Sequence, residues 1–161
     1  MKYKHILIFL AGAVAGILIT GVLAAIAMPK LMLRQHVSPY SLQETVERIT
    51  NNAVAKGWVV SSVMPLDESV RKHGGGDLPK TRLINLCQAQ HAARILQDES
   101  SRIVSVMMPC TIAVYEQADG EVAVGTMNAG LLGRLFGGVV ADVMAGPVAR
   151  EQRDFVAFCN P

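Results

Sequence analysis

An apolar run near the N-terminus constrains this chain more than any other feature of its sequence. From Ile6 to Met28 there is no charged residue, and Thr20 is the only polar side chain. A helix over this run, rising about 1.5 Å per residue, is long enough to cross a bilayer core of roughly 30 Å. We therefore predict one transmembrane helix, with residues 1–30 forming a membrane anchor or an uncleaved signal.

The same run shares features with a secretory signal peptide. Lys2 and Lys4 precede it, and Ala25-Ile26-Ala27 has the small-x-small form that a signal peptidase accepts. The run is longer than the roughly 7–15 apolar residues of a usual signal peptide, which favours a retained anchor over cleavage after Ala27. Lys30 and Arg34 follow the run, so the positive-inside rule separates the two orientations poorly. We expect a single-pass membrane protein with its domain in the periplasm or outside the cell.

The rest of the chain is the length of one compact domain. With 161 residues in total, the chain has room for one domain, predicted at 41–161, and a linker at 31–40. The net charge is +2, and there is no basic run with interleaved aromatic residues. These features exclude the electrostatic footprint of a nucleic-acid-binding protein.

Helix and strand signals alternate along this domain. The sequence Ser41-Leu42-Gln43-Glu44 fits a capping box and starts a helix that Gly57 ends. A strand over 58–63 and a short helix over 68–73 follow, and then a strand over 83–87 and a helix from 89 to about 98.

The next segment predicts three more strands. Residues 103–108 and 111–116 have strand composition, and Pro109 between them indicates a sheet edge or a bulge. The turn sequence Ala118-Asp119-Gly120 precedes a returning strand that carries Val122 and Val124. We therefore predict an α+β fold, with a mostly antiparallel sheet packed with helices and preceded by one transmembrane helix.

An apolar helical stripe runs through the C-terminal third. Its members are Leu131, Leu132, Leu135, Phe136, Val139, Val140, Val143 and Met144. Arg134 and Asp142 argue against a second membrane span, because each charge would cost about 2.5–3.5 kcal/mol on insertion scales. We expect the stripe, Leu135 included, to be buried against the sheet or a second subunit. The alternative is a partner or lipid surface made by Leu131, Leu135, Phe136 and Val140.

The three cysteines are the most chemically specific residues. Cys87 precedes a predicted helix and His91 follows it by four positions, an arrangement that could depress the pKa of a thiol. Cys110 follows Pro109, where an edge or bulge would make it accessible. We expect Cys87 and Cys110 to lie at the same end of the domain, close enough to share a ligand or a disulfide, with Cys159 apart. The competing interpretation is a set of small, inert, buried side chains.

Methionines near Cys110 extend this candidate thiol site. Met107, Met108 and Met127 would add thioether ligands suited to Cu(I), or an axial ligand for b-type haem, although methionines in strands more often belong to a core. No Cys-x-x-Cys motif and no general acid/base pair is present. The sequence thus identifies no cofactor and no catalytic residue, and it favours a protein that is not an enzyme.

Several short motifs resemble the DUF302 family, a domain of unknown function. The resemblance covers about 41–160 and is carried by Glu44-Thr45-Val46, Gly57-Trp58, Leu86-Cys87, Met107-Met108-Pro109-Cys110, Val114-Tyr115-Glu116, Asp119-Gly120 and Met127-Asn128. It implies a compact α+β domain, often dimeric, without established catalytic residues. Some bacterial members are similar in having a membrane segment ahead of the domain.

Two functional hypotheses follow from the sequence. The first is a membrane-anchored extracytoplasmic binding or accessory domain, which contacts the membrane through 6–28. A homodimer, to which Gly12 and Gly16 could contribute a close helix contact, or a membrane-protein partner would fit it. The second is a thiol-based redox, sulfur-carrier or metal- or haem-binding protein that uses Cys87 and Cys110.

Overall fold

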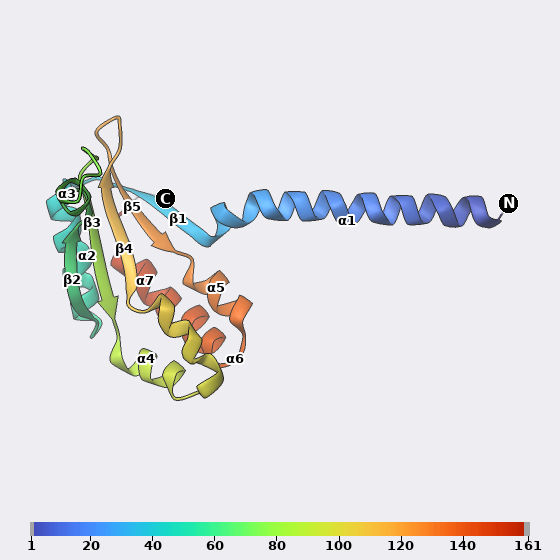
Figure 1. Ribbon diagram of the computed structural model, residues 1–161. Coiled ribbons are helices and arrows are strands. Elements are labelled where there is room, and N and C mark those ends of the chain that lie inside the picture. Colours follow the sequence, from blue (N-terminus) through green and yellow to red (C-terminus); the bar gives the residue numbers. More distant parts are fainter. Residues whose placement is uncertain (1, 160–161) are drawn as a thin grey trace. The chain divides into compact units, whose positions relative to one another are not determined.

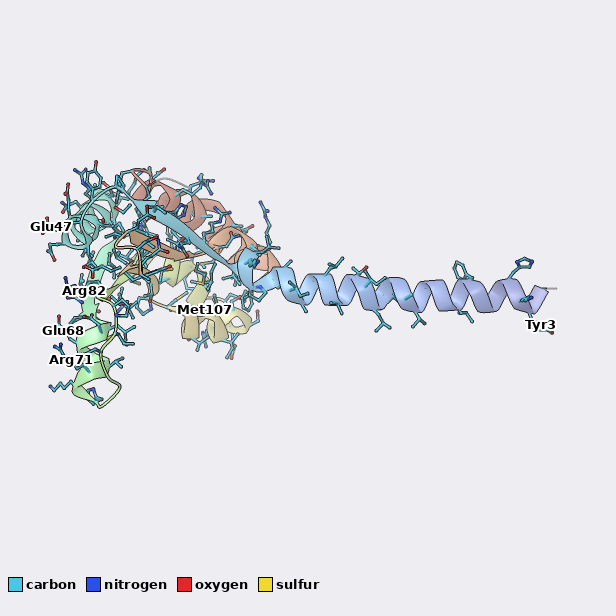
Figure 2. The ribbon with its side chains drawn as sticks, turned by 90° about the horizontal axis from the view of Figure 1, so that it is seen from above. Tyr3, Glu47, Glu68, Arg71, Arg82 and Met107 are labelled. Atoms are coloured by element: carbon cyan, nitrogen blue, oxygen red, sulfur yellow. The ribbon has the colours of Figure 1, made fainter. Side chains whose placement is uncertain are left out.

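The computed structural model describes residues 2–159. The chain forms two units, and the boundary between them along the chain falls between Met32 and Leu33. Helix α1, Lys2–Met32, forms the first unit (Figure 1). Within it, Gly12–Met32 is long and apolar enough to cross a membrane, with a mean hydropathy of 2.0. Figure 2 shows the side chain of Tyr3 standing out from this helix. The predicted N-terminal apolar helix is therefore present, with the length and composition that a bilayer requires.

The second unit is built on a five-stranded antiparallel sheet. The strands are β1 (Leu33–Ser38), β2 (Val59–Pro65), β3 (Thr81–Cys87), β4 (Cys110–Glu116) and β5 (Val122–Met127). Their order across the sheet is β1-β5-β4-β3-β2. Figure 1 shows helices α2 (Leu42–Ala55) and α7 (Ala149–Phe155) behind the sheet. The α+β prediction with an antiparallel sheet is confirmed.

Residue alternation gives the sheet one apolar and one polar face. Ile84 and Ile112 are fully buried neighbours on β3 and β4, and they belong to the core beneath the helices. On the other face, Thr111 Oγ1 donates a hydrogen bond to Asn85 Oδ1 at 2.8 Å, and Asn85 Nδ2 donates to Ser62 Oγ at 2.9 Å. These polar bonds run across three strands on the face that the core does not use.

Helix α2 begins and ends as its sequence predicts. Ser41 Oγ accepts a hydrogen bond from the amide of Glu44 at 3.3 Å, although the Glu44 carboxylate pairs with Arg48 instead of completing the capping box. Gly57 takes a φ of 78°, and the amide of Trp58 donates back to the carbonyl of Ala53 at 3.1 Å. This is a Schellman ending. It turns Trp58 into the core.

The predicted linker at 31–40 is wrong where β1 forms. Leu33–Ser38 pairs along its whole length with β5, from Leu33 opposite Met127 to Ser38 opposite Val122. The strand lies at the sheet edge and lacks a regular alternation of apolar and polar residues. Its strand character comes from a partner about ninety positions further along the chain, which no local pattern reveals.

The predicted strand at 103–108 is also wrong, because Glu99–Met107 forms a 3₁₀ helix, η1. Ser100 and Ser101 both donate hydroxyl hydrogen bonds to Asp98, which starts the turn. Val104 is buried and Met107 is half-buried, whereas Ile103 and Val106 are exposed. The inward residues Val104 and Met107 are three positions apart, as are the exposed Ile103 and Val106, and three residues per turn is the period of a 3₁₀ helix.

Pro109 does not mark a sheet edge. It follows a cis peptide bond and precedes β4, the central strand of the sheet. The missing amide hydrogen therefore falls just outside the ladder, where it costs no strand pairing.

The C-terminal stripe is divided among several helices. They are α5 (Ala129–Phe136), α6 (Gly138–Val140), the π-helical η2 (Ala141–Val148) and α7. Gly137 and Gly138 have φ angles of 73° and 51°, which end α5 and change the direction of the chain. Val140, Val143 and Met144 are buried, but Leu135 is 59% exposed. The expectation that Leu135 is buried is therefore wrong for this chain taken alone.

Two leucines on α5 provide a matched test of this packing. Leu132 is 7% exposed, so Leu132→Ala should lower the free energy of unfolding by about 2–5 kcal/mol. Leu135→Ala should change it by less than about 0.5 kcal/mol. Urea unfolding of both variants in detergent measures the difference. A large loss for Leu135→Ala would show that a second subunit or another surface covers this residue.

Candidate functional site

Two of the predicted thiols meet at one end of the sheet. Leu86 and Cys110 are partners across β3 and β4, and Cys87 follows Leu86 as the last residue of β3. Both cysteines line a cavity of about 30 Å³. We call it the cysteine cavity, and its other functional side chains include Trp58, His91, Met107 and Met108. The prediction that Cys87 and Cys110 share one end of the domain is confirmed.

Local backbone chemistry places His91 beside the cavity. Helix α4, Ala89–Leu96, follows β3 after a single residue, Gln88. The Gln88 side chain accepts a hydrogen bond from the amide of His91 at 2.8 Å, which caps the helix. The cap holds His91 in the first turn, next to the end of the strand that carries Cys87.

A polar contact missed in the sequence involves two of the residues that line this cavity. Trp58 Nε1 donates to Glu151 Oε2 at 2.7 Å, and His91 Nε2 lies 3.2 Å from the same oxygen. The Trp58 ring meets the rings of His91 and Phe155 edge-on. Glu151 is on α7, sixty positions from His91, so only the tertiary structure joins them. A lone tryptophan next to a helix-ending glycine was the one sequence signal available for this group.

The environment of Cys110 keeps its thiol protonated. Burial, followed by the proximity of Cys87, raises the pKa of Cys110 to about 11. Since the thiolate is the nucleophilic form, Cys110 is a weak nucleophile at neutral pH. Cys87, Cys110 and Cys159 are all free thiols.

The predicted thioether neighbours divide between two places. Met107 and Met108 line the cysteine cavity at the end of η1, and Met144 of η2 also lines it. Figure 2 labels Met107 on its helix. Met127 pairs with Leu33 and lines a different cavity, so it is not part of this set. Among residues 2–159, no group of three or more His, Cys, Asp or Glu side chains is placed to hold a metal ion.

Cys159 lies apart from the other two cysteines, as predicted. Burial raises its pKa, and a hydrogen bond with Ser38 opposes this effect. Ser38 is opposite Val122, which is opposite Glu116 at the far end of β4 from Cys110. Cys159 is therefore close to the other end of the sheet.

The predicted partner or lipid surface is only partly exposed. Leu135 and Phe136 are exposed and Leu131 is half-buried, but Val140 is 3% exposed. Val140 packs in the core cluster and cannot contribute to a surface. The exposed part is thus limited to the last turn of α5.

The geometry of the cysteine cavity suits a small apolar group. Most of its lining is aliphatic, aromatic or sulfur-containing, and its volume would hold about two water molecules. Gln88 and His91 add polar side chains to the lining, and Glu151, which does not line the cavity, contacts His91 and Trp58. Apolar walls with a few polar groups are the usual composition of small-ligand sites.

Comparisons with known proteins agree with this fold. The family model described as "Domain of unknown function DUF302" matches residues 34–158. The crystal structure of an uncharacterized conserved protein DUF302 from Bacillus stearothermophilus is similar, with a TM-score of 0.69 and 19% sequence identity. That match covers 80% of this chain and 98% of the other. No curated protein matches the chain.

The family match covers most of the chain and includes every strand of the sheet, apart from the first residue of β1. The structural match shares the α+β architecture. The chain belongs to the DUF302 family.

Proposed function

We propose that this chain is a membrane-anchored binding domain that takes a small, largely apolar ligand in the cysteine cavity. The observation that carries the proposal is the composition of that cavity, where apolar walls meet one localised polar contact. The anchor in this proposal is α1, which has the length and apolarity to span a bilayer. Lys2 and Lys4, in the first turn of α1, precede the apolar run as basic residues do in a secretory signal, and this arrangement supports an extracytoplasmic domain.

The protonation state of Cys110 supports a neutral ligand. A thiol with a pKa of about 11 is uncharged at neutral pH and contributes a small polarizable surface. Trp58 adds a rigid aromatic wall, held in place by its hydrogen bond to Glu151. A charged ligand would have to leave water for walls that offer few polar partners.

A second candidate function is a soft-metal or redox thiol site. The observation that favours it is the presence of two free thiols, Cys87 and Cys110, in one cavity with the thioethers of Met107, Met108 and Met144. Thiolates and thioethers are the ligands that Cu(I) prefers. The raised pKa of Cys110 opposes this function, because a ligating or attacking sulfur must first lose its proton.

The thiol of Cys110 should react slowly and with a steep pH dependence. At pH 8 about one Cys110 thiol in a thousand is ionised, and this fraction should rise about tenfold per pH unit until it approaches pH 11. Peptide-resolved mass spectrometry after iodoacetamide pulses measures the rate at each pH. In urea the pKa returns towards 9.0, so Cys110 should react roughly tenfold faster or more at pH 8. Fast alkylation of folded Cys110 at pH 7 would favour the thiol-based function instead.

Ligand binding can be followed through Trp58, the only tryptophan of the chain. Short-chain alkanols titrated into the full chain in detergent should change its fluorescence saturably. Ala92 lines the cavity, so Ala92→Leu should fill part of it and weaken binding roughly tenfold.

The neighbouring Ala93→Leu is the matched control, since Ala93 is exposed and does not line the cavity. Equal responses from the wild type and both variants would mean that alkanols act elsewhere. Native mass spectrometry of the purified chain distinguishes a co-purified apolar molecule from copper or a persulfide.

The membrane anchor has its own test. The full chain should remain in the membrane fraction after an alkaline carbonate wash, and its intact mass should include residues 1–28, because the apolar run exceeds a usual signal peptide. Protease added to spheroplasts should digest the domain if it lies outside the cytoplasm. A soluble protein whose mass begins near Met28 would contradict the anchor.

A further inference from the structure

A second cavity, of about 40 Å³, lies against the edge strand β1. Its polar lining comes from Arg34 and His36 of β1, Thr126 of β5, Asn128 before α5, and Gln152 and Arg153 of α7. The remaining lining includes the start of α5 and contains no acidic residue. We call it the basic cavity, and it shares no lining residue with the cysteine cavity.

Strand register brings these side chains to one face of the sheet. Arg34 is opposite Thr126, and His36 is opposite Val124. Directly opposed residues project to the same side, and Val124 is fully buried in the core on the helix-covered side. Arg34, His36 and Thr126 therefore face the side on which α7 packs.

Two polar side chains that line this cavity belong to largely buried residues. Thr126 is 5% exposed and Gln152 is 8% exposed. Neither side chain forms a hydrogen bond with any residue in the range 2–159. The Thr126 hydroxyl and the Gln152 amide are not among the fully enclosed, unpaired polar atoms of residues 2–159, so both are accessible and can bond a ligand in the cavity. Gln152 also borders an apolar void beside Ile112 and Phe155, which leaves the basic cavity as the side where a polar partner can bind.

The two arginines of the cavity have no ion pair within the described part of the chain. Arg34 and Arg153 are both exposed, and neither guanidinium lies within ion-pair distance of a carboxylate there. Asp154 is close enough to Arg153 to be affected by its charge, but it pairs with Lys56 at 2.6 Å. The carboxylate of Glu151 binds Trp58.

His36 adds a hydrogen-bonding group without adding charge. Burial, followed by the charge of Arg34, lowers the pKa of His36 below its usual value, so the ring is neutral at pH 7. A neutral imidazole still donates one N–H bond.

We propose that the basic cavity binds a phosphate group, carried either by a lipid head group or by a free phosphate. Arginine forks match the geometry of phosphate oxygens, and Thr126 and Gln152 are positioned to donate further hydrogen bonds. Helix α5 begins at Ala129 beside the cavity. Asn128 Oδ1 accepts from the Leu131 amide, and the preceding amides of Ala129 and Gly130 favour an anion.

A lipid is one source of this phosphate because Arg34 follows the last residue of α1 by two positions. The phosphate site and the ligand site in the cysteine cavity share no lining residue, so either proposal can fail without the other.

The test uses the full chain in a maltoside detergent, which contains no phosphate. Isothermal titration calorimetry follows the addition of inorganic phosphate and, separately, of the soluble lipid dihexanoyl phosphatidic acid. At least one should bind saturably. Arg153→Gln and the nearly isosteric Thr126→Val should each weaken that binding roughly tenfold.

Arg150→Gln is the matched control, because Arg150 is an exposed residue of α7 that does not line the cavity. Arg153 is exposed, so its variant tests the site even if Thr126→Val is poorly folded. Tighter binding of the lipid than of phosphate identifies a head-group site, and equal or weaker binding identifies a site for free phosphate. The proposal is overturned if neither ligand binds saturably, or if Arg153→Gln binds both as tightly as the wild type.

Discussion

The pairing of β4 with β3 on one side and β5 on the other holds this domain together. β4 is the middle strand of the sheet, and its inward residues Ile112 and Val114 are fully buried. Both outer strands, β1 and β2, join the sheet only through β5 and β3. Because register determines which side chains meet, the alignment of Leu86 with Cys110 also places the two thiols at one end.

Two chemically different cavities lie at that end of the sheet. β4 begins at Cys110 and its antiparallel neighbour β5 ends at Met127, so the cysteine cavity and the basic cavity share an end while lining different strands. Helix α7 contributes to both environments. Its Glu151 binds Trp58 beside one cavity, and the next residue, Gln152, lines the other. A shift of α7 would therefore change both, because consecutive helical residues move together.

Close packing explains why the C-terminal helices depart from a simple stripe. A Cβ atom on Gly133 would lie 2.6 Å from the Cβ of Met144, so α5 and η2 approach each other more closely than any larger residue allows. With this face of α5 packed on η2, and with the turn at Gly137 redirecting the chain, Leu135 and Phe136 are left exposed. The period of apolar residues predicted helices correctly, but it could not reveal where one helix ends and the next begins.

Local signals in the sequence determined much of this protein. The apolar run predicts α1, Ser41 and Gly57 delimit α2, and the turn at Asp119-Gly120 joins β4 to β5, since each feature depends on residues close together in the chain. They do not predict β1 or η1, because an irregular edge strand depends on its distant partner and β-branched residues also fit a 3₁₀ helix.

The sequence predicted Cys87, His91 and Cys110 as neighbours from their positions at the ends of elements. Only the tertiary structure joined Glu151 and Trp58 next to that site, placed Arg34 and Arg153 in the lining of one cavity, and buried Cys110 enough to keep its thiol protonated. Contacts of this kind join segments far apart in the chain, and burial exists only once those segments have packed.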